Sequence, residues 1–407
     1  MKYLITGITG QDGIHLTNFL LNNKKVDSIL GISRSPDSTK FLQNLNYLNN
    51  SLDTKKVSLN KSNLYNEKEV SNIITDYNPD FIFNLSGPSS VYNSFKQPGD
   101  SYNSIISIFD NLINACIVNK RFINFFQPSS SEMFADNGNL KLHEQSKYEP
   151  LSPYAKAKYD IHQKISTLRN EHDWNINSGI LFNHESEFRK DDYLFMKIIN
   201  NAIQIKNKKI TSFTLGSLDL IRDWSYAKDT TEAMYYITED LVGDDYVIGS
   251  GEGKSIKELA LTVFDFFDLD YSDYIQVDSK LLREQTPNTI VADTKKINNK
   301  RMVTVKPPLF YIWIEIVTIF SVMQFWIVAG EIFNARQAKR LFPLIIAGGS
   351  LAAILSGYSI KPFLIYFSSH NLVYLTIGFL LANVFMAIFL SPYIQSNEVV
   401  AAEPKVG

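Results

Sequence analysis

Short apolar runs alternate with helical patterns along the first three quarters of the chain. The apolar runs are Tyr3–Ile5, Ser28–Ser33, Val57–Leu59, Phe81–Leu85, Phe122–Phe126 and Ile176–Phe182. The segments with helical patterns are Gly13–Leu21, Glu67–Tyr77, Tyr102–Val118 and Pro153–Arg169. Strands that read as continuous apolar runs are buried on both faces, which is typical of a parallel sheet covered by helices. The pattern therefore predicts an α/β fold with a doubly wound parallel sheet.

Two of the predicted helices carry start signals. Asn66 followed by Glu69 resembles a capping box, in which the first side chain bonds the helix backbone and the second reaches back. Ser152 followed by Pro153 places a capping hydroxyl before a proline at the first helical position. These signals predict that helices begin at about residues 67 and 153.

The last quarter of the chain has a different composition. Residues 301–407 carry seven basic and four acidic side chains, whereas residues 1–300 carry 33 basic and 38 acidic ones. The segments Leu309–Ala329 and Leu372–Tyr393 are long and apolar, and Phe342–Ile360 is a weaker third candidate. A membrane-spanning helix needs roughly 20 apolar residues. We therefore expect two parts, residues 1–299 and a mostly helical, membrane-like tail of residues 300–407.

The overall composition excludes several classes of protein. The 407 residues include 40 Lys and Arg against 42 Asp and Glu, so bulk positive charge for nucleic-acid binding is absent. One cysteine, Cys116, excludes an intramolecular disulfide framework and fits a reducing compartment. One cysteine and six histidines also predict no metal site of the zinc type. Because Met1 leads directly into an apolar strand, we expect no signal peptide and a cytoplasmic location for this part.

The first candidate site is the glycine-rich turn that follows the first apolar run. Gly7, Gly10 and Gly13 have the spacing G-x-x-G-x-x-G and open a helix, with Gln11 and Asp12 between them. Such glycines allow a tight turn and a close approach of the backbone to a pyrophosphate at the helix N-terminus. The position of the motif predicts a Rossmann-type sheet that binds a dinucleotide.

The second run suggests which dinucleotide is bound. An acidic residue at the end of the second strand would bond the ribose 2′-hydroxyl of NAD. Here Ser33-Arg34-Ser35 stands instead, and Arg34 can pair with a 2′-phosphate. The residues therefore favour NADP, while a solvated surface arginine is the alternative.

The third candidate site combines Ser129–Glu132 with a Tyr-x-x-x-Lys pair, Tyr154 and Lys158. On a helix that begins at Pro153, these two side chains share a face. A nearby ammonium lowers the pKa of a phenol, so Tyr154 is expected to act as a base near neutral pH. A surface pair is the alternative, but the order of glycine turn, serines and Tyr-x-x-x-Lys favours catalysis.

Together these motifs resemble the extended short-chain dehydrogenase/reductase family, and more closely the GDP-mannose 4,6-dehydratase family. The resemblance covers residues 1–299, and it is carried by Thr6–Gly13, Asn84–Ser94, Ser129–Glu132, Ser152–Lys158, Ile180–Ser186 and Gly216–Asp229. The run Asn-His-Glu-Ser at residues 183–186 and the run Arg-Asp-Trp at residues 222–224 are its most specific parts.

The resemblance implies that GDP-mannose loses water through internal oxidation, elimination and reduction, with NADP as the hydride carrier. Tyr154 would take the proton of the sugar 4-hydroxyl, and Ser130 would bond the 4-oxygen. Lys158 would orient the cofactor ribose, and Glu132 would remove the C5 proton. A nucleotide-sugar epimerase or reductase, in which Glu132 has no such role, is one alternative. A non-catalytic, membrane-anchored protein is another.

The resemblance also implies which residues bind the two ligands. The cofactor contacts would be Gly7, Gly10, Gln11, Asp12, Gly13, Arg34, Asn63, Leu64, Leu85, Tyr154, Lys158 and His184. The substrate contacts would be Ser86, Ser131, Asn183, Arg189, Arg222 and Arg283. Related dehydratases of dTDP-glucose have aspartate before the catalytic glutamate, so Ser131 favours GDP-mannose. A homo-oligomer is a further expectation.

The tail resembles a different family. Residues of about 305–395, including the run from Asn334 to Leu344, are similar to a stretch of ATP/ADP translocases and related major-facilitator transporters. The dehydratases that residues 1–299 resemble continue, after the position of Asn299, with a turn and a last helix. This sequence lacks both. The sequence therefore indicates a dehydratase without its last helix, joined to a transporter-like, membrane-associated fragment.

Overall fold

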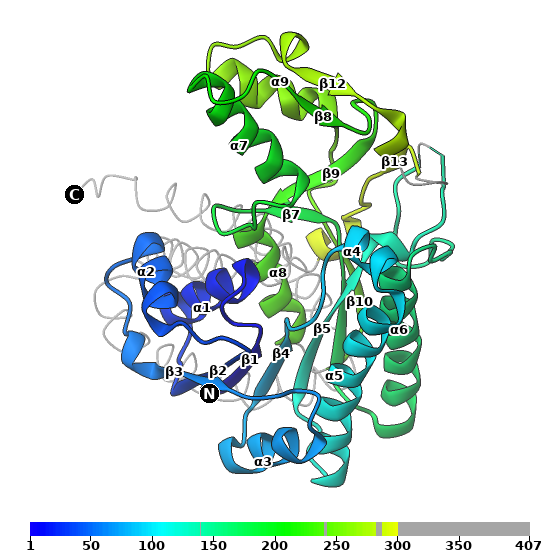
Figure 1. Cartoon of the computed structure of the whole chain (residues 1–407). Helices are drawn as coiled ribbons and strands as arrows, with labels where there is room; N and C mark the ends of the chain where they lie inside the picture. The colour runs from blue at the N-terminus through cyan, green and yellow to red at the C-terminus, as the bar shows by residue number, and fades with distance from the viewer. Residues whose placement is uncertain (139, 240–241, 282–286, 300–407) are drawn as a thin grey trace, which may run out of the picture. The chain divides into compact units, whose positions relative to one another are not determined.

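The structure is a computed structural model that describes residues 1–138, 140–239, 242–281 and 287–299. Seven strands form one sheet in the order β10-β6-β5-β4-β1-β2-β3, and every neighbouring pair is parallel (Figure 1). They are β1 Lys2–Thr6, β2 Ser28–Ser33, β3 Val57–Lys61, β4 Phe81–Asn84, β5 Asn124–Ser130, β6 Ile176–Leu181 and β10 Asp245–Ile248. The predicted parallel α/β fold is confirmed.

Helices cover both faces of this sheet (Figure 1). One face is covered by α1 Gln11–Asn23, α2 Ser38–Leu48 and α8 Ala227–Thr238, and the other by α3 Glu67–Tyr77, α5 Pro98–Val118 and α6 Pro153–His172, with the short α4 Val91–Lys96 before α5. Alternate residues of β1 enter opposite cores: Tyr3 and Ile5 pack in one, and Leu4 packs in the other. Burial on both faces explains why the strands read as continuous apolar runs.

A smaller part follows β6 and lies beyond the carboxyl ends of the strands (Figure 1). Its core joins α7 and α9 to a pair of parallel strands, and includes Ile198, Leu215, Phe264 and Ile275. Its elements are β7 Asn183–Glu185, α7 Leu194–Lys206, β8 Phe213–Leu215, β9 Ile221–Tyr226, β11 Gly253–Ser255, α9 Ile256–Phe266, β12 Ile275–Val277 and β13 Thr289–Ile290. Strand β9 pairs with β7, β11 and β13.

The two predicted helix starts are confirmed. The Asn66 side chain accepts hydrogen bonds from the backbone N–H groups of Lys68 and Glu69, and α3 begins at Glu67. The Ser152 hydroxyl accepts from the N–H of Ala155, 3.0 Å away, and proline is the first residue of α6. These caps satisfy N–H groups that a helix leaves without partners.

Strand β5 differs from its prediction. It begins at Asn124 rather than Phe122, because Phe122 is 48% exposed and packs against the Trp174 ring. It also continues to Ser130, where the register with β6 ends at Leu181. The serines predicted to follow the strand therefore include its last two residues, and their side chains are buried.

The predicted tail, residues 300–407, lies outside the described residues. The described helices include none that is both long and apolar enough to cross a bilayer. The candidate spans Leu309–Ala329, Phe342–Ile360 and Leu372–Tyr393 all fall in the part that is not described, so they stay predictions from the sequence.

The aspartate of the Arg-Asp-Trp run joins three segments of the chain. Asp223 is 1% exposed, and its carboxylate accepts from the backbone N–H and the hydroxyl of Ser250, both at 2.7 Å. It also accepts from the N–H groups of Gly251 at 2.8 Å and Ala292 at 3.1 Å. A single carboxylate thereby links β9 to the chain that follows β10 and to the chain that follows β13.

We expect Asp223→Asn to destabilise the protein, because the amide nitrogen cannot accept from N–H groups and would leave buried donors unpaired. The free energy of unfolding should fall by about 3 kcal/mol, measured by denaturant unfolding followed through tryptophan fluorescence. Asp219→Asn is the control, since Asp219 is exposed. Equal unfolding midpoints for the two variants would contradict the role of Asp223.

Candidate active site

The chain turns sharply where β1 ends, and this turn packs against the chain that leaves β4. Gly7 has φ of +68°, and a Cβ atom there would lie 2.6 Å from the carbonyl oxygen of Leu85. A Cβ atom on Gly13 would lie 2.4 Å from the carbonyl oxygen of Ile8. Only glycine fits such positions. Gly10 caps α1 without a side chain, so the first N–H groups of the helix suit a phosphate.

A chain of buried side chains joins the last residues of β1 and β4 to the middle of β5. The Thr6 hydroxyl on β1 donates to Oδ1 of Asn84 on β4 at 2.8 Å. Nδ2 of Asn84 donates to Oε1 of Gln127 on β5 at 2.7 Å. The polar ends of apolar strands were the signal that could have identified this chain in the sequence. It fixes the carboxyl ends of β1 and β4 relative to β5, beside the edge where ligands bind in such sheets.

The start of α1 is also bonded to the segment around β7. The side-chain amide of Gln11 donates to the carbonyl oxygen of His184 and accepts from the hydroxyl of Ser186, both at 3.0 Å. Two predicted cofactor residues, Gln11 and His184, are thereby brought together although 173 positions separate them.

His184 and Asp12 form a buried ion pair beside this contact. Nδ1 of His184 lies 2.8 Å from the carbonyl oxygen of Phe182 and must donate to it. Nε2 lies 3.2 Å from the Asp12 carboxylate, an arrangement that favours the imidazolium, in which both nitrogens donate. Burial lowers the pKa of His184, but the Asp12 carboxylate outweighs it and the pKa is raised. Burial raises the pKa of Asp12, and the imidazolium more than reverses this.

Ser130, Glu132 and Tyr154 meet where β5 ends and α6 begins. The Ser130 hydroxyl accepts from the N–H of Glu132 at 3.3 Å, in the 3-10 turn Ser131–Met133. Burial raises the pKa of Tyr154 well above its usual value; a hydrogen bond with Ser130 opposes this rise, and the Glu132 charge adds to it. The three predicted catalytic side chains are therefore close enough to influence one another.

Lys158 lies one turn after Tyr154 on α6. Its Nζ donates to the carbonyl oxygen of Pro128 at 2.8 Å and is 5.7 Å from the centroid of the Tyr154 ring. Burial lowers the pKa of Lys158 to about 8. The prediction that Lys158 brings the Tyr154 pKa near neutrality is wrong for the described protein, because desolvation of the phenolate dominates.

A family model described as GDP-mannose 4,6 dehydratase matches residues 4–301. The chain belongs to this family. A GDP-mannose 4,6 dehydratase of Arabidopsis thaliana is 30% identical over 299 residues, which are 72% of this chain and 79% of that protein. The Drosophila melanogaster GDP-mannose 4,6 dehydratase is 33% identical over 272 residues, 65% of this chain and 68% of that protein.

Solved structures share the fold of this dehydratase family member at low identity. A UDP-glucose 4-epimerase of Thermotoga maritima with UDP-glucose has a TM-score of 0.63 at 17% identity, and the match covers 74% of this chain and 92% of that one. A dTDP-glucose 4,6-dehydratase of Streptomyces venezuelae with NAD bound also has 0.63, at 16% identity, covering 74% and 90%. At such identities the likeness establishes the fold alone.

Three of the predicted cofactor contacts lie just after β2 and β3. Arg34 is exposed directly after β2. Asn63, beyond β3, is exposed and accepts from the N–H of Tyr65 through its side chain at 3.1 Å. Leu64 is buried, and its carbonyl oxygen accepts from Asn111. Because β2 and β3 are neighbours, these positions share one end of the sheet.

The predicted nucleotide-sugar contacts are brought together only in part. Ser131 is buried beside Glu132, and the N–H of Ser86 donates to the Thr6 hydroxyl. Nε of Arg189 lies 3.1 Å from the Glu185 carboxylate. Asn183, half-buried, pairs with Trp224 across β7 and β9.

Arg222 is bonded to the backbone in the structure. Its guanidinium donates to the carbonyl oxygens of Ile221 at 2.8 Å, Pro287 at 3.0 Å and Asn288 at 3.2 Å. It therefore holds the chain that leads to β13. Arg283 lies in residues 282–286, outside the described part of the chain, so its contact with substrate stays a prediction.

One contact at the site was not predicted from the sequence. The hydroxyl of Tyr193 lies 2.6 Å from that of Ser89, and the Arg189 guanidinium is 3.6 Å from the centroid of the Tyr193 ring. The contact joins the loop after β4 to the loop before α7. Tyr193 also affects the pKa of Tyr154, which places it near the Tyr154 phenol.

The residues around the β1 turn fit a dinucleotide. Gly7 and Gly13 leave room that a Cβ atom would fill, and α1 begins without a side-chain cap. Within the described ranges, no group of three His, Cys, Asp or Glu side chains could hold a metal ion.

Proposed function

We propose that the protein dehydrates GDP-mannose to GDP-4-keto-6-deoxymannose. The observation that carries this proposal is the convergence of Ser130, Glu132 and Tyr154 where β5 meets α6. A dehydrogenase needs the serine and tyrosine, whereas removal of a second proton from carbon requires a further base. Glu132 supplies that base, and membership of the family supports the substrate.

The chemistry divides between two bases. The Tyr154 phenolate accepts the proton of the sugar 4-hydroxyl, while Ser130 bonds the 4-oxygen. The 4-keto group acidifies the C5–H bond and Glu132 accepts that proton. Hydroxide leaves C6 as water with one of the two protons that Tyr154 and Glu132 have accepted, and the other proton returns to C5 when the C5–C6 double bond is reduced. A bound nicotinamide cofactor would supply the hydride acceptor and donor for C4 and C6, so the sugar would undergo no net oxidation.

The raised pKa of Tyr154 constrains this proposal. A phenol that is protonated at neutral pH has to lose its own proton before it can accept the proton of the sugar hydroxyl, so its surroundings have to favour the phenolate when ligands are bound. The Ser130 hydroxyl already lowers the pKa. The Lys158 ammonium, whose pKa of about 8 keeps it mostly charged at pH 7, lies 5.7 Å from the ring and favours the phenolate further.

Two matched variants test the function in the full chain. Tyr154→Phe keeps the ring but removes the base, so no NADPH absorbance at 340 nm should appear with GDP-mannose. Glu132→Gln should permit oxidation but block loss of the C5 proton, so NADPH should accumulate while product forms about 10²–10⁴-fold more slowly. Product is measured by mass spectrometry as loss of water. Normal dehydration by Glu132→Gln would favour a reductase or epimerase instead.

NADP is the cofactor that the site supports best. Arg34 is exposed after β2, and the first acid beyond it, Asp37, uses its carboxylate to cap α2 through the N–H of Lys40. This part of the site therefore offers a 2′-phosphate a cation and offers a 2′-hydroxyl no available carboxylate.

Arg34→Ala should weaken NADP binding by about tenfold and leave NAD binding nearly unchanged, since a charge-assisted bond to phosphate is worth about 1.5–3 kcal/mol. Dissociation constants from quenching of tryptophan fluorescence would measure this. Arg34→Lys is the control and should keep part of the preference. Equal losses for both cofactors would contradict the NADP assignment.

We also propose that the tail, residues 300–407, anchors the protein to a membrane. Leu372–Tyr393 has no Asp, Glu, Lys or Arg in 22 residues, a length that suits a bilayer. The family match ends at residue 301, so the transporter-like resemblance lies beyond it. The membrane anchor and the domain boundary at residue 299 are proposals that the sequence alone supports. The same is true of the cytoplasmic location and of the homo-oligomer.

The full chain should remain with membranes through a carbonate wash, because removal of such apolar segments from water is favourable. The measurement is fractionation followed by detection of the chain in pellet and supernatant. Recovery of monodisperse full-length protein without detergent would contradict the membrane anchor.

A further inference from the structure

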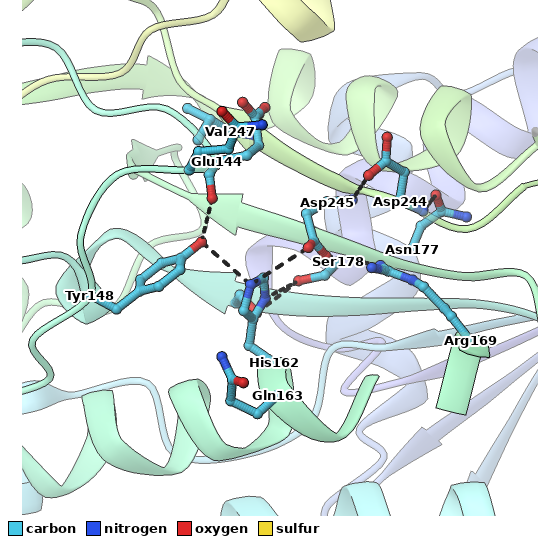
Figure 2. A network of polar contacts seen from close by, with 12 residues as sticks. Glu144, Tyr148, His162, Gln163, Arg169, Asn177, Ser178, Asp244, Asp245 and Val247 are labelled. Carbon is cyan, nitrogen blue, oxygen red and sulfur yellow. Dashed lines mark hydrogen bonds and ion pairs between the residues drawn. The ribbon is translucent and has the colours of Figure 1, made fainter. Parts of the chain in front are cut away.

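A buried histidine on α6 has no part in the proposed chemistry. His162 follows Lys158 by four residues, as Lys158 follows Tyr154, so all three lie on one face of the helix. His162 is 6% exposed and lies at the centre of a polar network that joins α6, β6 and β10 (Figure 2).

The first branch of this network leads to the catalytic serine. Nδ1 of His162 lies 3.1 Å from the hydroxyl oxygen of Ser178 on β6. That oxygen lies 2.9 Å from the hydroxyl oxygen of Ser129 on β5. Ser129 directly precedes Ser130, so this branch fixes the strand end that presents the catalytic hydroxyl.

The second branch leads to the turn that carries Glu132. Nε2 of His162 lies 3.3 Å from the hydroxyl of Tyr148 (Figure 2). The chain on either side of Tyr148 is hydrogen-bonded to the chain that follows Glu132. The N–H of Glu149 donates to the carbonyl oxygen of Met133 at 2.8 Å, and the N–H of Ala135 donates to the carbonyl oxygen of Lys147 at 2.9 Å. The Tyr148 ring also stacks on Phe134, with centroids 5.1 Å apart.

The hydrogen bonds assign one tautomer to His162. The Tyr148 hydroxyl donates its proton to the carbonyl oxygen of Glu144 at 2.9 Å, so Nε2 must donate toward Tyr148 and toward Asp245, 3.6 Å away. Nδ1 then accepts from Ser178, which in turn accepts from Ser129.

Burial supports a neutral ring in this position. It lowers the pKa of His162; the Asp245 carboxylate opposes this effect and the Arg169 guanidinium adds to it. Arg169 lies 2.9 Å from Asp245 and partly offsets its charge. A neutral ring with its proton on Nε2 satisfies every contact of the network.

We propose that His162 is a positioning residue that holds Ser130 and Glu132 in register with Tyr154. This rests on the proposed dehydration. Its ring sits on the helix that carries the base, and its two nitrogens reach the two segments that carry the other catalytic groups. A small displacement of a reacting group lowers the rate strongly, so loss of the ring nitrogens affects turnover more than binding.

The test compares His162→Phe with the wild type in the full chain. We expect kcat to fall about tenfold, while KM for GDP-mannose and the dissociation constant for NADP change less than about twofold. His162→Asn offers an oxygen where Nδ1 lies, and it should recover part of the loss through Ser178. His172→Phe, at a half-buried position at the end of the same helix and away from this network, is the control and should leave kcat unchanged.

A double-mutant cycle separates positioning from packing. In a Ser130→Ala background, His162→Phe should reduce kcat by a smaller factor than it does alone, because part of its effect passes through Ser130. A purely structural histidine would lower the unfolding midpoint and leave kcat per folded molecule unchanged in both backgrounds. If His162→Phe does not fold, Ser178→Ala replaces it in the same cycle, with the same expectation.

The outcomes distinguish the two proposals. Wild-type protein that removes no water from GDP-mannose would overturn the proposed function. Active wild type together with folded His162→Phe or Ser178→Ala of equal kcat would overturn the positioning role alone.

Discussion

The contact between the turn after β1 and the chain leaving β4 is the constraint on which the site depends. Gly7 has no side chain, so the carbonyl oxygen of Leu85 can lie where a Cβ atom would otherwise be. The hydroxyl of Thr6 bonds Asn84 at the same place. Because β1 pairs with both β2 and β4, displacement of this contact would move both halves of the sheet and the start of α1.

The proposed reaction sets two conflicting requirements where β5 meets α6. Burial of Tyr154 would exclude water from the reacting atoms, but it also raises the pKa of the phenol that acts as a base in the proposed reaction. The surrounding groups offset this through specific contacts. Ser130 bonds the phenol, and Lys158 is held near the ring by its bond to the carbonyl oxygen of Pro128. A site of this kind depends on accurate placement more than on the intrinsic basicity of its residues.

The elements with strong local signals were predictable from the sequence. Strand β2 and helix α3 have the predicted bounds, because an apolar run marks one and the Asn66 cap marks the other. The glycine turn and the Tyr-x-x-x-Lys pair were likewise recognisable, since short-range geometry requires particular residue types there. Strand β5 was placed two residues too early and ended too soon, because its last serines are polar and find partners only on other strands.

The contacts that assemble the site were decided by tertiary structure. The carboxylate of Asp223 accepts from groups 27 and 69 positions further along the chain, and no local pattern indicates them. The sequence carries no signal for the contact of His162 with Ser178, which β6 brings to it. Arg222, predicted from the sequence to contact substrate, donates to carbonyl oxygens of the chain before β13. Sequence patterns indicate which positions of each segment are buried, because apolar side chains favour burial whichever segment carries them. The partner of a buried polar group depends instead on which segments the sheet places side by side.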